Sequence, residues 1–172
     1  DRVSLSYEKL LNVSTKLSLA IYNKEYFDAP IVYSPDSTAS PVFLMDRNIT
    51  FNQLKSGGRA KSQGLELLVE KKRAENFYGH FGGSIFNSTF IDYLGNERNR
   101  DTNYQYLLNV VGGYRPSNKW EISVRWSFFG GKPYTEIDEA KSIILNESIY
   151  FTHKHNEKRT PAYHNLFLRY EY

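Results

Sequence analysis

Strict two-residue alternation of side chains constrains the fold of this chain more than any other feature. The segment WEISVRWSFF, residues 120–129, alternates between an apolar set (Trp120, Ile122, Val124, Trp126, Phe128) and a polar set (Glu121, Ser123, Arg125, Ser127). Successive side chains of a β-strand point to opposite faces of the sheet. The segment therefore predicts a strand with one apolar face and one polar face.

The same alternation recurs along the chain. Clear examples are TKLSLAIY, GLELLVEKK and the stretch 165–170 within NEKRTPAYHNLFLRY. No segment has the apolar stripe at three- and four-residue spacing that is typical of a helix. We therefore predict an all-β, antiparallel fold of about seven strands. The expected ranges are 1–11, 14–27, 59–72, 77–90, 103–115, 119–135 and 162–172.

The connections between the expected strands alternate in length. LNVS, RAEN and PSNK are tight turns, whereas the links 28–58, 91–102 and 136–161 are long, polar and irregular. Short periplasmic turns and long extracellular loops are typical of transmembrane β-barrels of the outer membrane. The expected strands, at about 11 to 17 residues, are longer than the ~5–6 of globular sheets and suit a tilted membrane crossing. Trp120 and Trp126 are expected in the aromatic girdles of such a barrel.

Composition narrows the possible partners and chemistry. The chain has 22 Lys and Arg against 19 Asp and Glu, a formal charge of +3, which is too small and too evenly spread to predict a nucleic-acid partner. It contains no cysteine, which excludes a disulfide scaffold, a thiolate zinc site and a cysteine nucleophile. The N-terminal DRVSLSYEKLL has no signal-peptide layout and is expected to come from the interior of a longer protein.

Three stretches match the motifs of a known family, in the family's order and spacing. GRAKSQGLELLVEK (58–71) matches Gly-x-Ala-x-Ser-x-Gly-aliphatic-Glu-aliphatic through Gly58, Ala60, Ser62, Gly64 and Glu66. WSFFGGKPYT (126–135) matches Ser-Gly-x-Pro-Tyr-Thr through Gly131, Pro133, Tyr134 and Thr135. The third, NEKRTPAYHNLFLRYEY, matches Asn-x-x-Arg-x-Pro-x-Tyr-His-x-Leu-Asp-Leu-Arg through Asn156, Arg159, Pro161, Tyr163, His164, Leu166, Leu168 and Arg169. Together they resemble the C-terminal part of the barrel of a TonB-dependent outer-membrane receptor.

The resemblance implies a partial domain, residues 1–172, cut from a larger plugged barrel. Such receptors have about 22 strands around a plug, so the plug and the final strands are expected to lie outside this chain, and Tyr172 is not expected to be the parent's natural end. The chain departs from the family where Phe167 replaces the usual Asp and Asn165 replaces a frequent Arg. A charge contact with the barrel lumen is therefore expected to be missing.

The function implied by the resemblance is energised import of a large, scarce ligand across the bacterial outer membrane. The ligand class would be a siderophore or other metal chelate, a vitamin or a glycan. Expected partners are outer-membrane lipid, the protein's own plug, the TonB complex acting through that plug, and a surface lipoprotein or ligand at the extracellular loops. The resemblance implies no enzyme activity, no catalytic residue and no cofactor.

Two groups of residues are candidates for these contacts. Aromatic and charged residues of the expected extracellular loops are candidate ligand or partner contacts: Tyr93, Arg98, Arg100, Tyr150 and His153. Polar residues of the expected strands are candidates for facing the lumen and contacting the plug, although ordinary polarity of a wet barrel wall is the preferred explanation for them: Glu66, Glu121, Arg125 and Arg169.

Two further clusters have simpler explanations. His153 and His155 in HKH could place two imidazoles on one side of an extended segment, but in so charged a loop we expect them to be solvated and predict no metal site. Asp138 and Glu139 are expected to belong to an exposed loop and not to act as an acid–base pair.

Two other classes of protein remain open from the sequence. A soluble β-sandwich used for binding or adhesion would share the alternation, but its apolar faces would meet inside one core. An outer-membrane barrel enzyme would need a Ser/His or Asp/His constellation near the rim, and none is convincing in the sequence.

Overall fold

The computed structural model of the chain describes residues 1–32, 54–74, 76–92 and 94–172. Its elements are β1 (Arg2–Asn12), β2 (Thr15–Val32), β3 (Leu54–Ala74), β4 (Phe77–Ile91), β5 (Glu97–Asn99), β6 (Tyr106–Tyr114), β7 (Glu121–Phe129), β8 (Pro133–Tyr134), α1 (Glu139–Leu145), the 3₁₀ helix η2 (Thr152–Lys154), β9 (Lys158–Arg159) and β10 (Tyr163–Glu171). Most described residues lie in antiparallel strands, which confirms the all-β prediction.

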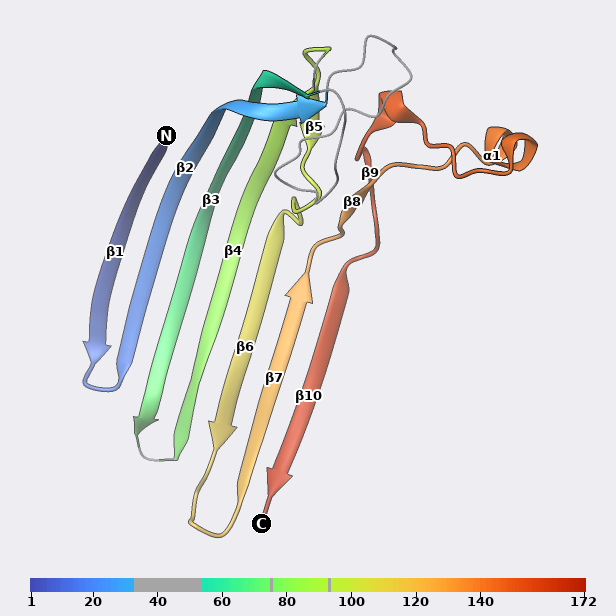
Figure 1. Cartoon of the computed structure of the whole chain (residues 1–172). Helices are drawn as coiled ribbons and strands as arrows, with labels where there is room; N and C mark the ends of the chain where they lie inside the picture. The colour runs from blue at the N-terminus through green and yellow to red at the C-terminus, as the bar shows by residue number, and fades with distance from the viewer. Residues whose placement is uncertain (33–53, 75, 93) are drawn as a thin grey trace.

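The seven long strands form one sheet in which each strand pairs with its neighbours along the chain. The order is β1-β2-β3-β4-β6-β7-β10, with β5 added to β4 and with β8 and β9 paired separately. Figure 1 shows the tight turns at one end of this sheet, the turn end, and the long connections at the other, the loop end. Among the described residues the sheet is open, with β1 and β10 as its edges.

The structure corrects several expected boundaries. β2 continues to Val32 and β3 begins at Leu54, so part of the expected loop 28–58 is a long hairpin, and residues 33–53 lie outside the described part. The expected strand 119–135 ends at Phe129, and two residues of β8 follow after a break. The expected loop 91–102 contains β5, which pairs with the end of β4.

The expectation that the chain has no helix is wrong for one short segment. Within the expected loop 136–161, α1 begins after Asp138, whose side chain accepts a hydrogen bond from Lys141 N, and it ends at Asn146 in a left-handed conformation. Seven residues are too few for an apolar stripe to stand out in the sequence. In the described part of the chain, no helix combines the length and the apolar character needed to cross a bilayer.

The register of the sheet determines which side chains share a face, because directly paired residues point the same way. One row of paired residues is Tyr7, Leu19, Leu67, Gly83, Leu108, Phe128 and His164. The adjacent row is Glu8, Ser18, Leu68, Gly82, Asn109, Ser127 and Asn165. The two faces expected for residues 16–21, 65–70, 122–128 and 165–170 are therefore confirmed.

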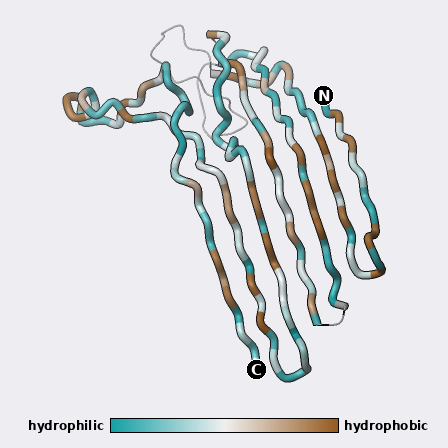
Figure 2. The backbone as a smooth tube through the Cα atoms, turned by 180° about the vertical axis from the view of Figure 1, so that it is seen from behind, coloured by the Kyte–Doolittle hydropathy of each residue, from teal (hydrophilic) through white to brown (hydrophobic). Residues whose placement is uncertain are grey.

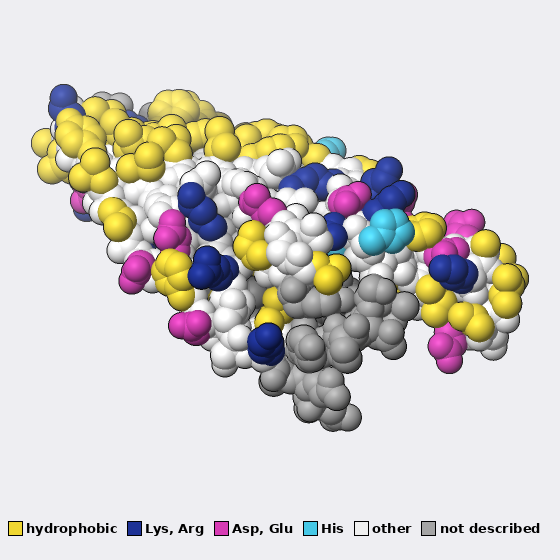
Figure 3. Space-filling model, turned by 90° about the horizontal axis from the view of Figure 1, so that it is seen from above, with side chains coloured by type: hydrophobic (Ala, Val, Ile, Leu, Met, Phe, Trp, Pro, Cys, Tyr) yellow, Lys and Arg dark blue, Asp and Glu magenta, His cyan; other side chains and the backbone are white. Residues whose placement is uncertain are grey.

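We call one side of the sheet the apolar face and the other the polar face. The apolar face carries Val3, Leu5, Tyr7, Leu17, Leu19, Ile21, Leu65, Leu67, Val69, Phe81, Ile85, Tyr106, Leu108, Val110, Ile122, Val124, Trp126, Phe128, Leu166, Leu168 and Tyr170. Figure 2 shows hydrophobic and hydrophilic residues following one another along each strand, and Figure 3 shows hydrophobic side chains gathered along one side of the sheet.

The apolar face has no second layer over it in the described structure. Leu5 and Leu168 are each 73% exposed and Ile85 is 68% exposed. The buried hydrophobic residues among those described are only Ala29, Ile31, Ala60 and Phe90, and they lie at the loop end. The sheet therefore leaves a continuous apolar surface exposed, which a soluble monomer rarely does.

On the polar face, the Tyr78 ring lies directly over Gly113, its cross-strand partner. A Cβ at position 113 would come within 2.3 Å of the Tyr78 ring, whose hydroxyl donates a hydrogen bond to Glu121.

We predict that Gly113→Val displaces the Tyr78 ring and costs about 1–3 kcal/mol of folding free energy, as overpacking does elsewhere. Chemical denaturation measures the loss. Gly113→Val in a Tyr78→Ala background serves as the control and should cost less, and an equal cost in both backgrounds would contradict the prediction.

Candidate functional site

The candidate site lies at the loop end of the sheet, where three connections meet. We call residues 92–105, between β4 and β6, the first loop, and residues 130–162, between β7 and β10, the second loop. The β2–β3 hairpin bends across the same region (Figure 1), where Asp28 has a φ of 54° and the register shifts twice. This bend packs Ala29 and Ala60 with Phe90 into a small buried core.

The first loop is organised around Asp92, whose side chain is fully buried. Its carboxylate accepts hydrogen bonds from the backbone N–H groups of Leu94 (2.9 Å) and Asn96 (2.8 Å). It also forms an ion pair with Arg98, with Nε and Oδ2 3.0 Å apart. Gly95 N donates to Asp92 O at 3.0 Å, which closes the turn. A buried carboxylate with this many donors fixes the shape of the loop.

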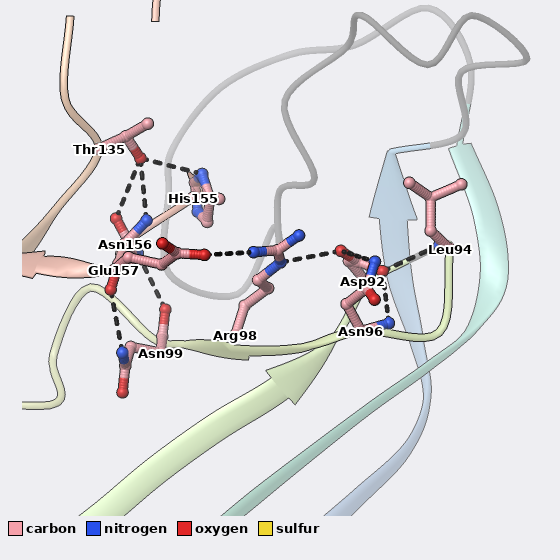
Figure 4. Close-up of polar contacts among 9 residues, drawn as sticks. All are labelled: Asp92, Leu94, Asn96, Arg98, Asn99, Thr135, His155, Asn156 and Glu157. Carbon is pink, nitrogen blue, oxygen red and sulfur yellow. Dashed lines mark hydrogen bonds and ion pairs between the residues drawn. The ribbon is translucent and has the colours of Figure 1, made fainter. Parts of the chain in front are cut away.

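Arg98 connects this turn to the second loop. Its Nη1 lies 3.3 Å from Glu157 Oε1, while its side chain is only 10% exposed. Figure 4 shows Arg98 between the two carboxylates, with Asp92 on one side and Glu157 on the other. The guanidinium therefore joins segments that are 59 residues apart in the sequence.

A reciprocal pair of hydrogen bonds joins Asn99 of the first loop to Asn156 of the second. Asn99 Nδ2 donates to Asn156 O and Asn156 Nδ2 donates to Asn99 O, both at 2.9 Å. Asn156 Nδ2 also donates to Asp101 Oδ1 at 2.6 Å, and Asn156 N donates to Thr135 Oγ1 at 3.0 Å. Asn156 is 1% exposed and has a φ of 54°, a left-handed conformation that asparagine tolerates better than most residues.

The expectation that His155 is solvated is wrong. His155 is 2% exposed, its ring meets Phe90 edge-on at 5.9 Å between centroids, and its Nδ1 lies 3.3 Å from Thr135 Oγ1. The segment is also not extended, because η2 ends at Lys154 directly before this residue. His153, in contrast, is exposed and stacks edge-on against Phe151. The two imidazoles therefore have different environments, and no group of three or more His, Cys, Asp or Glu suited to a metal occurs among the described residues.

Arg159 is the second charged group that joins the loops. Its Nη1 donates to the backbone oxygens of Asn103 and Gly131, the latter at 3.1 Å, and its Nη2 donates to Asn99 Oδ1 at 3.2 Å. Burial lowers the pKa of the Arg159 guanidinium from its usual range, because the charged form loses contact with water. The three oxygens replace part of that hydration.

Two of the motifs recognised in the sequence meet at this point. Pro133 pairs with Arg159 and Tyr134 with Lys158 in the β8–β9 ribbon, and Thr135 contacts Asn156. Pro133 has no N–H to donate, and a two-residue ribbon tolerates this more easily than a central strand. The motif residues therefore build the base of the second loop.

Gly130 lies where the two loops leave the sheet side by side. A Cβ at position 130 would lie 1.8 Å from the backbone oxygen of Tyr104, and Gly130 N donates to Tyr106 O at 3.0 Å. We call this contact between Gly130 and residues 104–106 the neck.

We predict that Gly130→Ala forces the two backbones apart and costs about 1–3 kcal/mol, with faster amide exchange in both loops. Gly95→Ala is the matched control, because no atom lies within 4 Å of a Cβ there and the cost comes only from its φ of 86°. Disturbance confined to the second loop in Gly130→Ala would contradict the prediction.

The second loop also carries an exposed projection, residues 136–151, which we call the lobe. Backbone hydrogen bonds from Asp138 N to Ile149 O (2.8 Å) and from Phe151 N to Glu136 O (2.9 Å) close its base. At its tip, Ile143 and Ile144 are 81% and 79% exposed. Figure 1 shows α1 standing away from the sheet, beyond the loop end of β10.

The candidate ligand contacts lie in different environments. Tyr93 lies outside the described residues. The Arg98 guanidinium is held by the two ion pairs above, and Arg100 lies over the Tyr26 ring at 5.5 Å from its centroid. Tyr150 and His153 are exposed on or beside the lobe. Of this group, Tyr150 and His153 are therefore best placed to touch a molecule outside the chain.

The candidate lumen-facing residues all lie on the polar face of the sheet. Glu66 pairs with Ala20 and Ser84, and Arg125 pairs with Val111 and Phe167. Glu121 and Arg169 lie on the same face near the turn end, paired with Glu171 and Ser123. Glu121 also lies 3.8 Å from Arg115. Arg125 and Arg169 line one pocket with Tyr78, whose hydroxyl bonds to Glu121, whereas Glu66 lies apart on β3.

Three residues that do form a cluster were not predicted from the sequence: Asn99, Asp101 and Asn103. Asn103 is fully buried, and its Nδ2 donates to Asn87 Oδ1 and to Asn99 Oδ1, both at 2.9 Å. The repeated spacing Asn-x-Asp-x-Asn in an otherwise ordinary loop is the only local signal of their role. Asp101 accepts from Asn156, and Asn103 Oδ1 is buried without a hydrogen-bond partner among the described residues. The hydrogen bonds of the cluster fix the shape of the loop.

No family model, curated protein or solved structure matches this chain.

Proposed function

We propose that the chain is a segment of the wall of a transmembrane β-barrel in the bacterial outer membrane. The parent barrel would be a TonB-dependent receptor that imports a large, scarce ligand. In this account the apolar face meets lipid and the polar face meets a wet, plugged interior. The long loops at the loop end lie outside the cell, and the tight turns lie in the periplasm.

The uncovered apolar face is the observation that carries the proposal. A soluble sandwich would have to bury it against a second sheet, and the described residues contain no such sheet. Alternation of apolar and polar residues with the apolar set outward is the pattern of an outer-membrane barrel strand. Aromatic residues near the turn end, with Phe77 stacked on Tyr114 at 4.5 Å and Trp120 edge-on to Tyr114 at 5.8 Å, suit an interfacial girdle.

The apolar residues of the first and last strands lie at different positions along the sheet. On β1 they centre on Leu5, whose row passes through Ile21 on β2, whereas on β2, β3, β4 and β6 they centre on one row, Leu19, Leu67, Gly83 and Leu108. On β10 they centre on Leu168, and that row reaches β2 at Thr15 through Val124, Gly112, Gly79 and Lys71. Measured on β2, from residue 15 to residue 21, the centre shifts by six residues over the six steps from β1 to β10.

This shift gives the angle by which the strands depart from the perpendicular to the line through the two end centres. At about 3.4 Å per residue and about 4.8 Å between strands, the centre moves roughly 20 Å along the strands over roughly 29 Å across them. The angle is therefore roughly 35°, within the strand tilt of about 35–45° in transmembrane barrels. An end-to-end shift of this size is compatible with lipid-facing residues that lie level with the membrane.

The loop cluster supports a binding role for the loop end. A buried ion pair and reciprocal hydrogen bonds fix the first and second loops, while Tyr150, His153 and the tip of the lobe stay exposed. Rigid presentation of exposed aromatic and apolar groups lowers the entropy lost on binding. In the proposed receptor, these loops would contact the ligand or a surface lipoprotein. The plug would contact the polar face, and the TonB complex would act on the plug to drive import.

Two experiments test the proposal on the whole protein. We expect the protein to need detergent for extraction from the outer membrane and to run as a heat-modifiable band on gel electrophoresis. We also expect cells to accumulate one of three labelled probes, a ferric siderophore, cobalamin or an oligosaccharide, and to lose this uptake when an uncoupler collapses the proton gradient. Extraction into aqueous buffer as a monomer would contradict the barrel. If the protein needs detergent but uptake does not respond to the uncoupler, the barrel proposal is supported. The proposal of energised import is then contradicted.

A further inference from the structure

Two neighbouring glycines leave the backbone bare on the apolar face near the turn end. Gly79 of β4 pairs with Gly112 of β6, and Lys71 of β3 lies beside them in the same row. We call Gly79 and Gly112 the glycine pair. A Cβ at position 79 would come within 2.3 Å of Val111 O, so a larger residue does not fit there. Apart from its chain neighbours, a Cβ at position 112 would meet one atom within 4 Å, Tyr78 O at 3.4 Å. The surface over Gly112 is therefore open.

Aromatic side chains border the glycine pair. In the next row towards the turn end, Phe77 stacks on Tyr114 with 4.5 Å between ring centroids, and Trp120 meets Tyr114 edge-on at 5.8 Å. In the next row towards the loop end, Phe81 pairs with Val110. The Tyr114 hydroxyl and the Trp120 indole N–H form no hydrogen bond with the residues that the structure describes. Both groups are therefore available as donors to an anion.

Lys71 places a positive charge beside the glycine pair. It is half-buried, and in the described part of the chain its ammonium has neither an ion pair nor a hydrogen bond. The described carboxylates near the turn end lie instead in rows of the polar face: Glu8, Glu70, Glu121 and Glu171. This end of the apolar face is therefore complementary to a negatively charged group.

The position of Lys71 along its strand places it at the edge of the apolar layer. On β3 the apolar residues centre on Leu67, four residues before Lys71. Four residues span roughly 13 Å along a strand, and a tilt of about 35–45° reduces this to roughly 10 Å along the membrane normal. Half the height of the apolar band of a barrel is about 12 Å. The long aliphatic stem of lysine can carry its ammonium over the remaining distance to the lipid headgroups.

We propose that Lys71, the glycine pair, Tyr114 and Trp120 form a binding site for an anionic phospholipid of the periplasmic leaflet. The lipid phosphate lies against the Lys71 ammonium and within reach of the two ring donors, and the start of an acyl chain covers the glycine pair. Basic groups at the membrane surface attract anionic lipids in this way. The inference rests on the proposed function, because it takes the apolar face as the lipid side and the turn end as the periplasmic side.

Native mass spectrometry of the whole protein in detergent micelles tests the site. Phosphatidylglycerol and phosphatidylcholine with identical acyl chains are titrated separately, because only the first carries a net negative charge. We expect Lys71→Met to bind one phosphatidylglycerol about fivefold more weakly than the wild type and to bind phosphatidylcholine unchanged. Lys72→Met is the matched control, because it removes the same charge from an exposed residue that the alternation places on the polar face. It should bind both lipids as the wild type does, and lipid sites elsewhere on the protein are common to all three proteins.

Gly112→Leu tests the site without changing its charge. The open surface over Gly112 accepts a side chain, so we expect this variant to fold and to bind phosphatidylglycerol more weakly than the wild type. It also gives an answer if Lys71→Met fails to fold. Excess inorganic phosphate should not displace the lipid, because the site holds the acyl chain as well, and displacement would overturn the lipid assignment.

Equal binding of phosphatidylglycerol by the wild type and Lys71→Met would overturn the inference and leave the barrel proposal standing. A protein that stays soluble and monomeric without detergent would contradict the proposed function, and the lipid site with it. The two failures are therefore separate results.

Discussion

Leu108→Arg will cost about 2–4 kcal/mol of folding free energy in a bilayer, the price of an arginine on the lipid face of a barrel strand near the membrane centre. Leu108 lies on the apolar face between Gly83 and Phe128. In the proposed barrel its side chain meets hydrocarbon, where a guanidinium has neither water nor a counter-ion. Denaturant titration of the whole protein folded into lipid vesicles measures the cost.

The neighbouring residue supplies the control. Leu107 lies on the polar face between Ser84 and Phe129, and an arginine there would reach a wet interior. Leu107→Arg should therefore cost about 0.5 kcal/mol or less, the range of surface substitutions away from special features. Equal costs at the two positions would mean that both faces have the same environment, which a barrel wall does not allow.

Asp92→Ala will release the first loop at a cost of about 3–5 kcal/mol, because it breaks a buried ion pair and leaves Arg98 without its inner partner. The substitution also removes the acceptor for the backbone N–H groups of Leu94 and Asn96. Because the stability is lost locally, we expect faster amide exchange and faster proteolysis in the first loop, while the amides of the strands stay protected.

Glu157→Gln removes only the exposed ion pair of Arg98 and leaves the buried pair with Asp92 intact. The Glu157 side chain is 53% exposed, and exposed ion pairs contribute about 0–1 kcal/mol. Glu157→Gln should therefore have only a small effect on amide exchange and proteolysis in the first loop. A small effect of Asp92→Ala as well would show that the buried pair does not hold the loop.

Much of the sheet could be predicted from the sequence, because a two-residue period is a local property. The alternation in residues 65–70 and 122–128 places each side chain on a face without any knowledge of its partner, and the register confirms those faces. The shift of the apolar residues between the first and last strands could not be predicted in this way. It depends on which residue pairs with which across all seven strands.

The loop cluster could not be predicted, because its contacts are far apart in sequence. Asn99 and Asn156 are separated by 57 residues, and neither loop on its own contains a sign of the other. His155 shows the same limit: its charged neighbours suggest solvent, yet Phe90 of β4, which is buried with Ala29 and Ala60, covers it. The short helix α1 could not be predicted from the sequence because two turns are too few for a periodic pattern.

Two adjacent leucines can show whether the two faces of the sheet have different surroundings. Leu67 lies on the apolar face and Leu68 on the polar face, and the chain has no cysteine of its own. Leu67→Cys and Leu68→Cys can each carry a nitroxide spin label in the whole protein reconstituted into lipid.

If the sheet is a barrel wall, we expect the label at position 67 to collide mainly with oxygen, which concentrates in lipid. The label at position 68 should collide mainly with a water-soluble nickel chelate, or be immobilised against the plug. Access of the nickel chelate to position 67, or equal oxygen access at both positions, would contradict the barrel-wall account.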